Sequence, residues 1–299
     1  MSKPDLRRPP APVIADLLPR LLEVLQKLPY GPSVALGRCV GTVAFHLYGP
    51  DRERVLGNLA LAFPEATPQW RRGVAKETFR HWVSSALEAL HFVGHPDAVA
   101  SRVRWVNREP LLAAAGEARG LMVLTSHFGN YGLLVMALAA LGLEPAVIGK
   151  KPHRPETVSG AFSNYQREVL LPRIGVSLIK SYERPAAEIA QRLGAGGTVV
   201  VLGDFPEGRA RTRAAFLGMQ QEFATGSAMI AKSTGADVVQ MLTRRDGFGA
   251  HTITVESIHP VGDVQQLVED YARLTEEYVL RDPAQWLWLH RAWKSEAAP

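Results

Sequence analysis

A histidine stands where a mostly apolar run ends and a helical pattern begins. Residues 121–125 form the run, His127 follows two residues later, and helical periodicity starts near residue 131. In α/β proteins, ligands and catalytic groups collect at the carboxyl ends of strands, beside helix N-termini. An imidazole at such an edge could serve as a general base that removes a proton from a hydroxyl or an amine. The alternative is a histidine that caps a helix or fills a loop.

A second group of reactive side chains follows the apolar, β-branched run at 198–202. Its members are acidic and basic residues, namely Asp204, Glu207, Arg209, Arg211 and Arg213. An arginine-rich loop flanked by glycine could hold a phosphate through guanidinium groups and backbone N–H groups. Either carboxylate could also orient the imidazole of His127, if parallel strands bring the two loops together. The alternatives are a solvated basic loop and, for Asp204, a carboxylate that binds only its own turn.

A third group of residues is basic and begins directly after a short apolar run at 146–149. It consists of Lys150, Lys151, Arg154 and Arg167. Basic side chains near a strand edge can bind the phosphates of an anionic substrate and can raise its rate of encounter. We expect substrate binding here, with a solvated basic surface as the alternative.

The elements that must position these residues alternate as in an α/β protein. Apolar runs predict strands at 121–125, 146–149, 176–179, 198–202, 237–243 and 251–256. Helical periodicity predicts helices at 51–61, 69–92, 131–141, 156–170, 184–193, 224–233 and 263–280. The run at 198–202 is apolar and β-branched throughout, which is typical of a strand buried on both faces of a sheet.

The N-terminal 50 residues predict two amphipathic helices. Apolar residues recur every three or four positions over 13–28, and the segment 34–48 is apolar apart from Arg38 and His46. This second segment is shorter than the ~20 residues that a spanning helix needs. Such helices either pack on the main domain without lipid contact or associate with a membrane surface, which the basic net charge of the chain favours.

This pattern suggests a division of the chain into two parts. Residues 1–50 would form the membrane-associating helices, and 51–299 the catalytic domain. The latter would consist of a helical lead-in over 51–110 and an α/β core over 111–299.

Composition limits the classes of partner and cofactor. Lys and Arg total 34 against 29 for Asp and Glu, which gives a net charge of +5 and suits an anionic membrane or an acidic protein. Nucleic acid is not expected, because the arginines are dispersed and no nucleic-acid-binding signature occurs. Cys39 is the single cysteine, so no intramolecular disulfide can form. No metal-binding histidine spacing and no glycine-rich nucleotide motif occurs, so we expect neither a metal nor another cofactor.

Three blocks in order resemble the lipid A late acyltransferase family, bacterial enzymes that move a fatty acyl chain from acyl carrier protein onto a glycolipid. The block His127-Phe-Gly-Asn-Tyr is similar to the family's His-x-x-x-x-acid motif. The other blocks are Asn58-Leu-Ala-Leu-Ala-Phe-Pro64-Glu and Gln285-Trp-Leu-Trp288-Leu-His-Arg291-Ala-Trp293-Lys. The likeness runs from about residue 30 to the C-terminus. Residues 205–209, Phe-Pro-Glu-Gly-Arg, also resemble a block of the glycerophosphate acyltransferases, which share the fold.

The resemblance implies a glycerolphosphate-acyltransferase-like αβα sandwich with a mixed, mostly parallel sheet and N-terminal amphipathic helices. It implies an acyl donor carried by acyl carrier protein or coenzyme A, a membrane glycolipid or phospholipid acceptor, and no cofactor. It places the protein on the cytoplasmic face of the bacterial inner membrane, peripheral or monotopic. His127 would be the general base, and Arg167 matches an arginine of the family. Asn130 and nearby backbone N–H groups could bind the developing oxyanion.

Gly132 departs from the family motif, which has an acidic residue at this position. A carboxylate there would orient the imidazole and stabilise the imidazolium, and its loss from a comparable pair can cost on the order of 10⁴ in rate. Either Asp204 or Glu207 therefore replaces it, or the reaction is slow or lost. Two alternatives follow: a catalytically inactive lipid-binding protein on the same fold, and a thioesterase in which His127 activates water.

Overall fold

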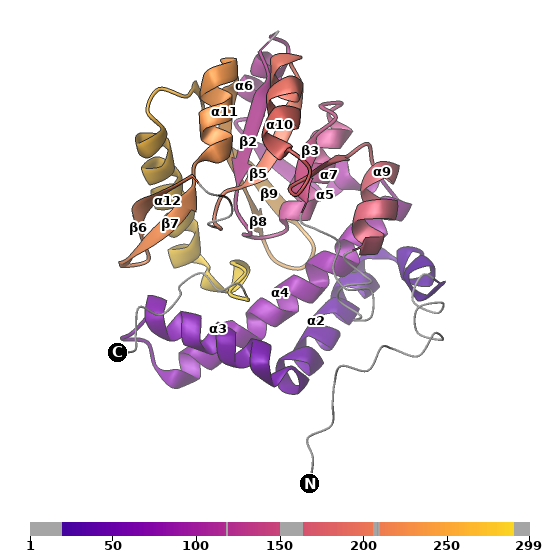
Figure 1. Cartoon of the computed structure of the whole chain (residues 1–299). Coiled ribbons are helices and arrows are strands. Elements are labelled where there is room, and N and C mark those ends of the chain that lie inside the picture. The colour runs from indigo at the N-terminus through magenta and orange to yellow at the C-terminus, as the bar shows by residue number, and fades with distance from the viewer. Residues whose placement is uncertain (1–19, 118, 150–163, 206–207, 209, 290–299) are drawn as a thin grey trace.

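Seven strands form one mixed sheet in the computed structural model, in the order β1-β9-β8-β2-β5-β3-β4 (Figure 1). The structure describes residues 20–117, 119–149, 164–205, 208 and 210–289. The strands of this sheet are β1 (Val103–Val106), β2 (Leu121–Thr125), β3 (Ala146–Gly149), β4 (Ser177–Lys180), β5 (Thr198–Leu202), β8 (Asp237–Arg245) and β9 (His251–Pro260). Neighbours are parallel except β8 and β9, so β1 and β9 run against the other strands. The expected α/β fold with a mixed, mostly parallel sheet is confirmed.

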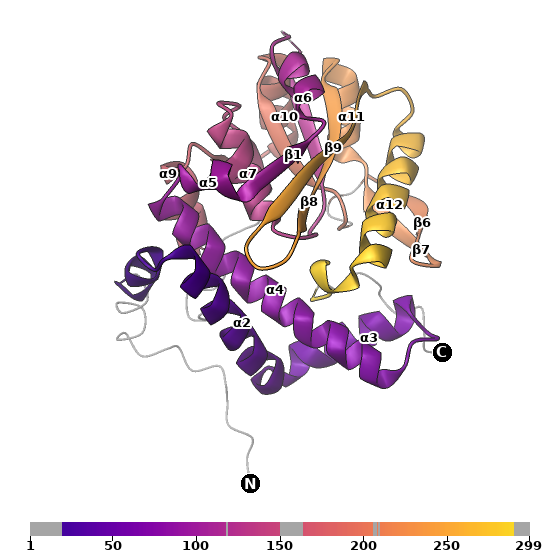
Figure 2. The same cartoon turned by 180° about the vertical axis from the view of Figure 1, so that it is seen from behind.

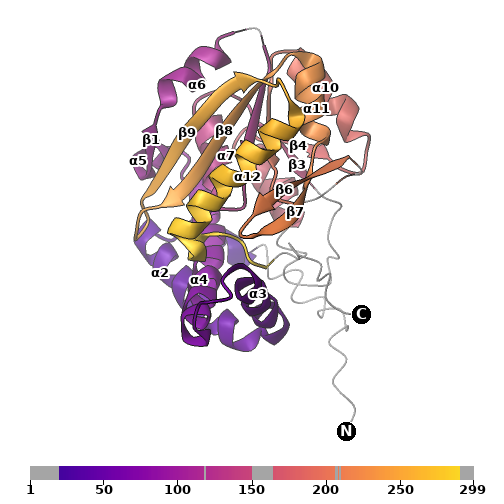
Figure 3. The same cartoon turned by 90° about the vertical axis from the view of Figure 1, so that its left-hand side faces the viewer.

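Helices cover both faces of the sheet. One face packs against α5 (Ala98–Arg102), α6 (Arg108–Ala115) and α7 (Tyr131–Ala140). The other packs against α10 (Pro185–Gly194), α11 (Gly226–Thr234) and α12 (Val264–Arg281). Figure 3 shows α12 lying across this second face. The central strands β2 and β5 bury apolar side chains on both sides, which explains their continuous apolar sequences.

A helical layer lies beneath one edge of the sheet and consists of α2 (Tyr30–Leu47), α3 (Gly49–Ala62) and α4 (Pro68–Gly94). The hydroxyl of Thr67 caps α4 by accepting the backbone N–H of Trp70 at 3.2 Å, as its sequence predicts. In Figure 2 the β8–β9 hairpin reaches down to α4. Helix α2 approaches α4 closely at two glycines. A Cβ atom at Gly37 would lie 2.5 Å from Ser84 Cα, and one at Gly41 would lie 2.6 Å from the Phe79 carbonyl oxygen.

Strands 121–125, 146–149 and 198–202 have the predicted bounds, whereas β8 and β9 extend two and four residues beyond theirs. The extensions pair with each other in an antiparallel ladder, so backbone hydrogen bonds hold them without a continuous apolar pattern. Strand β1 falls inside the expected helical lead-in of 51–110 and joins the main sheet. It has only four residues, too few for a clear periodicity.

The expectation of an arginine-rich loop after residue 204 is partly wrong. Arg211 and Arg213 lie on β6 (Arg211–Phe216), which pairs with β7 (Met219–Ala224) in a separate antiparallel hairpin. The expected helix at 156–170 is described only from residue 164, where helical residues lead into a π-helical turn, η1 (Gln166–Leu170), and into α9 (Leu171–Arg173). Its first part, 156–163, lies outside the described residues.

Gly41→Ala should destabilise the protein by about 1–3 kcal/mol, because the added methyl group would overlap backbone atoms of α4. Gly57→Ala in α3 is the matched control, since a Cβ there meets no atom within 4 Å. The control should gain about 0.5–1 kcal/mol from helix propensity. Urea unfolding followed by circular dichroism measures both. Equal stabilisation of the two variants would contradict the close helix contact.

Candidate active site

His127 and Asp204 lie side by side at the carboxyl edge of the sheet because β2 and β5 pair in register. Thr125 is the register partner of Leu202, and each polar residue stands two positions beyond its strand. The backbone N–H of Gly203 donates to the Thr125 carbonyl at 2.9 Å and continues the ladder into the two loops. Parallel pairing thus brings together two residues that are 77 positions apart in the chain.

The carboxylate of Asp204 is fully buried and binds three donors. Its Oδ1 lies 2.8 Å from Nδ1 of His127, and its Oδ2 accepts the backbone N–H of His127 at 2.9 Å. The indole Nε1–H of Trp286 also donates to Oδ2, at 2.9 Å. Burial alone would raise the pKa of Asp204, but the neighbouring imidazole and these hydrogen bonds outweigh it and hold the pKa below its usual range. Asp204 is therefore an anion that fixes the imidazole with a proton on Nδ1.

Aromatic rings restrict the imidazole further. The ring of His127 lies 4.9 Å from that of Tyr131 and 4.5 Å from that of Phe205, measured between centroids. Burial, with a smaller contribution from the charge of Asp204, raises the pKa of Tyr131 to about 12. The phenol therefore stays neutral at physiological pH and packs against the imidazole without competing for its proton.

The C-terminal segment holds the loop that carries His127. The His127 carbonyl accepts the backbone N–H of Leu287 at 3.0 Å, and the Gly129 N–H donates to the Gln285 carbonyl at 3.0 Å. Gly129 has a φ of 59°, and a Cβ atom there would lie 1.9 Å from the carbonyl oxygen of Thr243. Only glycine fits this position, because both the backbone conformation and the close approach exclude a side chain.

Asn130 is the N-cap residue of α7, and its side-chain amide is held by two hydrogen bonds. Its Oδ1 accepts the backbone N–H of Leu133 at 3.1 Å, and its Nδ2 donates to Oε2 of Glu88 at 2.8 Å. These contacts commit the side-chain oxygen and one N–H of the amide, and the role of Asn130 as an oxyanion donor stays a prediction. The backbone N–H groups of the first helical turn are better suited, because helix geometry leaves them without intrahelical acceptors.

A buried ion pair anchors this cap to the rest of the molecule. Glu88 on α4 accepts from Arg245 of β8 at 2.7 Å and from the Tyr30 hydroxyl at 3.0 Å. Burial alone would raise the pKa of Glu88, but a hydrogen bond with His251 and the charge of Arg245 hold it well below its usual range. Arg245 also donates to Nδ1 of His81 at 3.1 Å. Burial, followed by the charge of Arg245, lowers the pKa of His81 to about 4, so this histidine is a neutral acceptor.

The remaining predicted site residues lie largely outside the described part of the structure. Those for which no position is described are Lys150, Lys151, Arg154, Glu207 and Arg209. Arg167 belongs to η1, and only its backbone is described. Within the described residues, no group of three or more His, Cys, Asp or Glu side chains is arranged to hold a metal ion.

Three residues that hold this site, Glu88, Arg245 and Trp286, were not predicted from the sequence. Glu88 is the one clue, because it interrupts an apolar stretch of a predicted helix, where a charge requires a partner. Arg245 follows Arg244 at the end of a predicted strand and resembles a solvated charge. Trp286 belongs to the C-terminal block that resembles the acyltransferase family, but that resemblance does not indicate a contact with Asp204.

The sequence and the fold were compared with those of known proteins. The family model described as bacterial lipid A biosynthesis acyltransferase matches residues 7–295. The lipid A biosynthesis lauroyltransferase of Escherichia coli K12 is 24% identical over 284 residues, which cover 92% of this chain and 89% of that protein. The palmitoleoyltransferase of the same organism is 26% identical over 279 residues, with 90% and 87% covered. The 1-acyl-sn-glycerophosphate acyltransferase PlsC of Thermotoga maritima is a structural neighbour with a TM-score of 0.34 and 15% identity, covering 88% of this chain and 97% of that one.

Asp204→Asn should lower the free energy of unfolding at neutral pH by about 1–3 kcal/mol, because an amide cannot accept from all three donors. The deficit should be constant above about pH 4, the region where Asp is ionised in the unfolded chain. It should shrink as pH falls through the lower native pKa of Asp204, where wild type loses this stabilisation too.

Urea unfolding at several pH values measures this deficit. The control is Asp270→Asn on the exposed surface of α12, where an ion pair with Arg273 at 3.3 Å contributes at most about 1 kcal/mol. A pH-independent difference for Asp204→Asn, or none at neutral pH, would show that the buried carboxylate is not an ionised anchor.

Proposed function

This chain belongs to the bacterial lipid A biosynthesis acyltransferases, and we propose that it moves a fatty acyl chain from a thioester to a hydroxyl or amine of a lipid A-like membrane glycolipid, with His127 as general base. The observation that carries the assignment of the base is the 2.8 Å contact between His127 Nδ1 and Asp204. Because the ring carries its proton on Nδ1, where Asp204 binds it, the unprotonated Nε2 is the nitrogen that can act as the base.

The proposed reaction is a direct transfer. Nε2 of His127 takes the proton of the acceptor hydroxyl as its oxygen attacks the thioester carbonyl carbon. Backbone N–H groups at the start of α7 stabilise the resulting oxyanion, where one well-placed donor is typically worth ~3 kcal/mol. The tetrahedral intermediate then expels the thiolate, which takes the proton back from the imidazolium. The products are the acylated acceptor and a free thiol, and the enzyme returns to its starting state.

Asp204 takes the place of the acid that the motif lacks at Gly132. A carboxylate bonded to Nδ1 would both set the tautomer and stabilise the imidazolium formed during the reaction. Desolvation strengthens this effect, since the carboxylate is fully buried and its charge is not screened by water. This contact supports an active enzyme over the alternative of a catalytically inactive lipid-binding homologue.

The donor is either acyl carrier protein or coenzyme A, both of which are acidic and suit a chain with a net charge of +5. The relatives are named as a lauroyltransferase and a palmitoleoyltransferase, so lauroyl and palmitoleoyl thioesters are the first donors to assay. No cofactor enters the proposed reaction.

We further propose that α2 rests on the cytoplasmic face of the inner membrane. One face of α2 packs on α4, while an apolar stripe at helical spacing is exposed, namely Leu36, Val40, Val43 and Leu47. Among the helices in the described residues, none combines the length and the apolar character that crossing a bilayer requires. Peripheral attachment through this stripe fits both observations. On this proposal residues 1–50 bind the membrane and 51–299 carry the reaction, although α2 is packed against the latter.

His127→Ala should abolish acyl transfer, and Asp204→Asn should reduce kcat by on the order of 10²–10⁴ with a smaller change in KM, because the imidazole loses its orienting anion. Adding Gly132→Glu to Asp204→Asn should recover part of the rate. A Cβ at position 132 meets only Asn130 Oδ1, at 3.4 Å, so the position accepts a side chain. The assay measures transfer from labelled acyl carrier protein and acyl-CoA to extracted membrane lipid by mass spectrometry.

Free fatty acid in place of acylated lipid would identify a thioesterase. Full activity in a folded His127→Ala variant would refute the base assignment. Full activity in Asp204→Asn would refute the role of Asp204 while leaving that of His127 intact.

Val43→Asp and Leu47→Asp should weaken binding to vesicles that contain phosphatidylglycerol, because each places a charge on the stripe that would enter the interface. Met229→Asp is the matched control, since Met229 is equally exposed but lies on α11, at the opposite end of the molecule in Figure 1. Co-sedimentation measures the bound fraction. Equal binding of all three variants would exclude α2 as the contact surface.

A further inference from the structure

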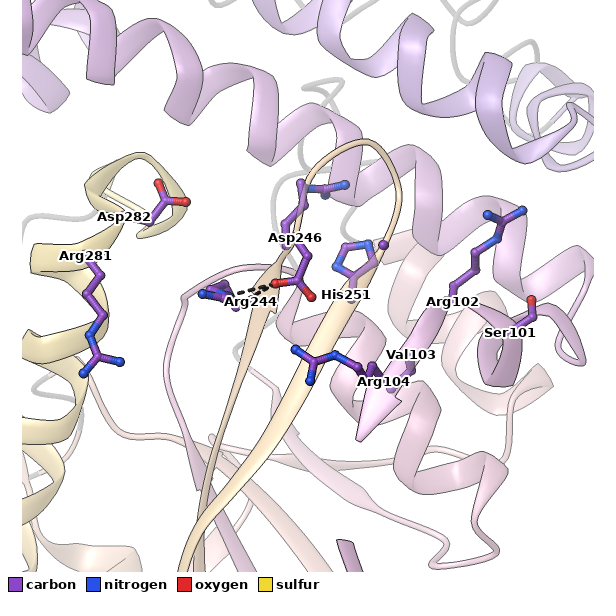
Figure 4. Close-up of a pocket in the computed structure, with 11 residues that line it drawn as sticks. Ser101, Arg102, Val103, Arg104, Arg244, Asp246, His251, Arg281 and Asp282 are labelled. Carbon is purple, nitrogen blue, oxygen red and sulfur yellow. Dashed lines mark hydrogen bonds and ion pairs between the residues drawn. The ribbon is translucent and has the colours of Figure 1, made fainter. Parts of the chain in front are cut away.

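A cavity of about 750 Å³ lies beside the β8–β9 hairpin (Figure 4). Five arginines line it, namely Arg102 at the end of α5, Arg104 on β1, Arg244 and Arg245 on β8, and Arg281 at the end of α12. Neither His127 nor Asp204 is among the residues that line it. The cavity is nevertheless close to the catalytic loop, because Gly129 packs on the strand residue that precedes Arg244.

Positive charge is in excess in this cavity. Its carboxylates are Asp246 and Asp282. The charge of Arg245 is neutralised by Glu88, so the other four arginines and these two carboxylates leave a net charge of +2. Asp246 is already bound, since it accepts from Arg244 at 2.9 Å and from the Thr252 hydroxyl. Asp282 accepts the Gln285 amide at 2.6 Å.

Arg244 is paired with Asp246 at 2.7 Å, whereas Arg102, Arg104 and Arg281 have only weak local partners in the described part of the chain. Arg104 donates to the neutral Thr252 hydroxyl at 2.9 Å, and Arg102 lies 4.5 Å above the ring of Tyr30. Arg281 is 3.9 Å from the carboxylate of Glu277, at the limit of an ion pair. Arg102, Arg104 and Arg281 thus line one cavity without a close carboxylate partner among the described residues, an arrangement that suits an anionic ligand.

A buried polar atom at the cavity supports the same conclusion. His251 lines the cavity and is only 1% exposed, and its Nδ1 has no hydrogen-bond partner among the described residues. Its other nitrogen, Nε2, lies 3.4 Å from the carboxylate of Glu88. An unpartnered nitrogen in the interior is costly, and because Nε2 faces the Glu88 carboxylate as a donor, Nδ1 is an acceptor that a hydroxyl group or a protonated oxygen of a ligand would satisfy.

We propose that this cavity binds the phosphate group of an anionic ligand, either a lipid headgroup or a phosphate compound free in solution. A guanidinium group can donate two parallel hydrogen bonds to two oxygens of a phosphate, and one phosphate can accept from several guanidinium groups at once. The volume is in the range of ligand sites and accommodates a group the size of a phosphorylated sugar or glycerol.

The position of the cavity favours a headgroup. Phe248, at the tip of the same hairpin, is 64% exposed, and its ring lies 4.0 Å from the position that a Cβ would take at Gly31 on α2. The hairpin therefore extends from the cavity to the helix proposed to lie on the membrane. Phosphate binding itself does not depend on acyl transfer.

Calorimetric titration of the full chain with inorganic phosphate tests the proposal. Wild type should bind phosphate, and Arg104→Gln combined with Arg281→Gln should weaken binding by at least about tenfold. Arg273→Gln is the matched control, because Arg273 is an exposed arginine of α12 outside the cavity. His127→Ala should bind phosphate like wild type, which separates this site from catalysis. Thermal unfolding verifies that each variant is folded.

Vesicles of phosphatidylcholine with and without phosphatidic acid distinguish the two sources. For a headgroup, wild type should prefer the vesicles with phosphatidic acid, free phosphate should compete, and the double variant should lose the preference. For a soluble ligand, phosphate should bind while the double variant leaves vesicle binding unchanged. No phosphate binding by wild type, or equal binding by the folded double variant, would overturn the proposal.

Discussion

One buried carboxylate joins three distant parts of this chain. Asp204, at the end of β5, binds the ring and the backbone of His127 beyond β2 and the indole of Trp286 near the end of the sequence. An ionised group in the interior requires such partners, because desolvation without them is costly. The arrangement depends on the register of two parallel strands, since a shift of one residue would turn either side chain to the opposite face.

A second buried carboxylate secures the same loop from the helical layer. Glu88 binds Arg245 from the sheet and Asn130 from the start of α7. The four-residue loop that begins at His127 is therefore held by anionic anchors on both sides, and Gly129 fits closely under a strand carbonyl between them. A catalytic imidazole gains from such a rigid setting, because orientation contributes to the rate.

The apolar sequences of β2 and β5 were sufficient to predict these strands, because burial on both faces leaves a continuous pattern. Those strand ends identified His127 and Asp204 as candidates. Their contact was one possibility among others, since strand order and register are tertiary properties and Asp204 could equally bind only its own turn. Glu88 stands out in an apolar stretch, but its partner Arg245 looks like a solvated charge until the pairing is seen. The β6–β7 hairpin was missed because its exposed faces carry charges that resemble a loop.

The hydrogen bonds from Gln285 and Leu287 to the catalytic loop have a consequence for biosynthesis. During synthesis, strands β2 to β5 can pair once residue 202 has been made, but the loop gains its backbone partners, and Asp204 its indole, only when residues 285–287 follow. A growing chain that has not reached residue 285 has His127 without the contacts that order it. Order in the His127 loop therefore arises later in synthesis than the strands that carry it.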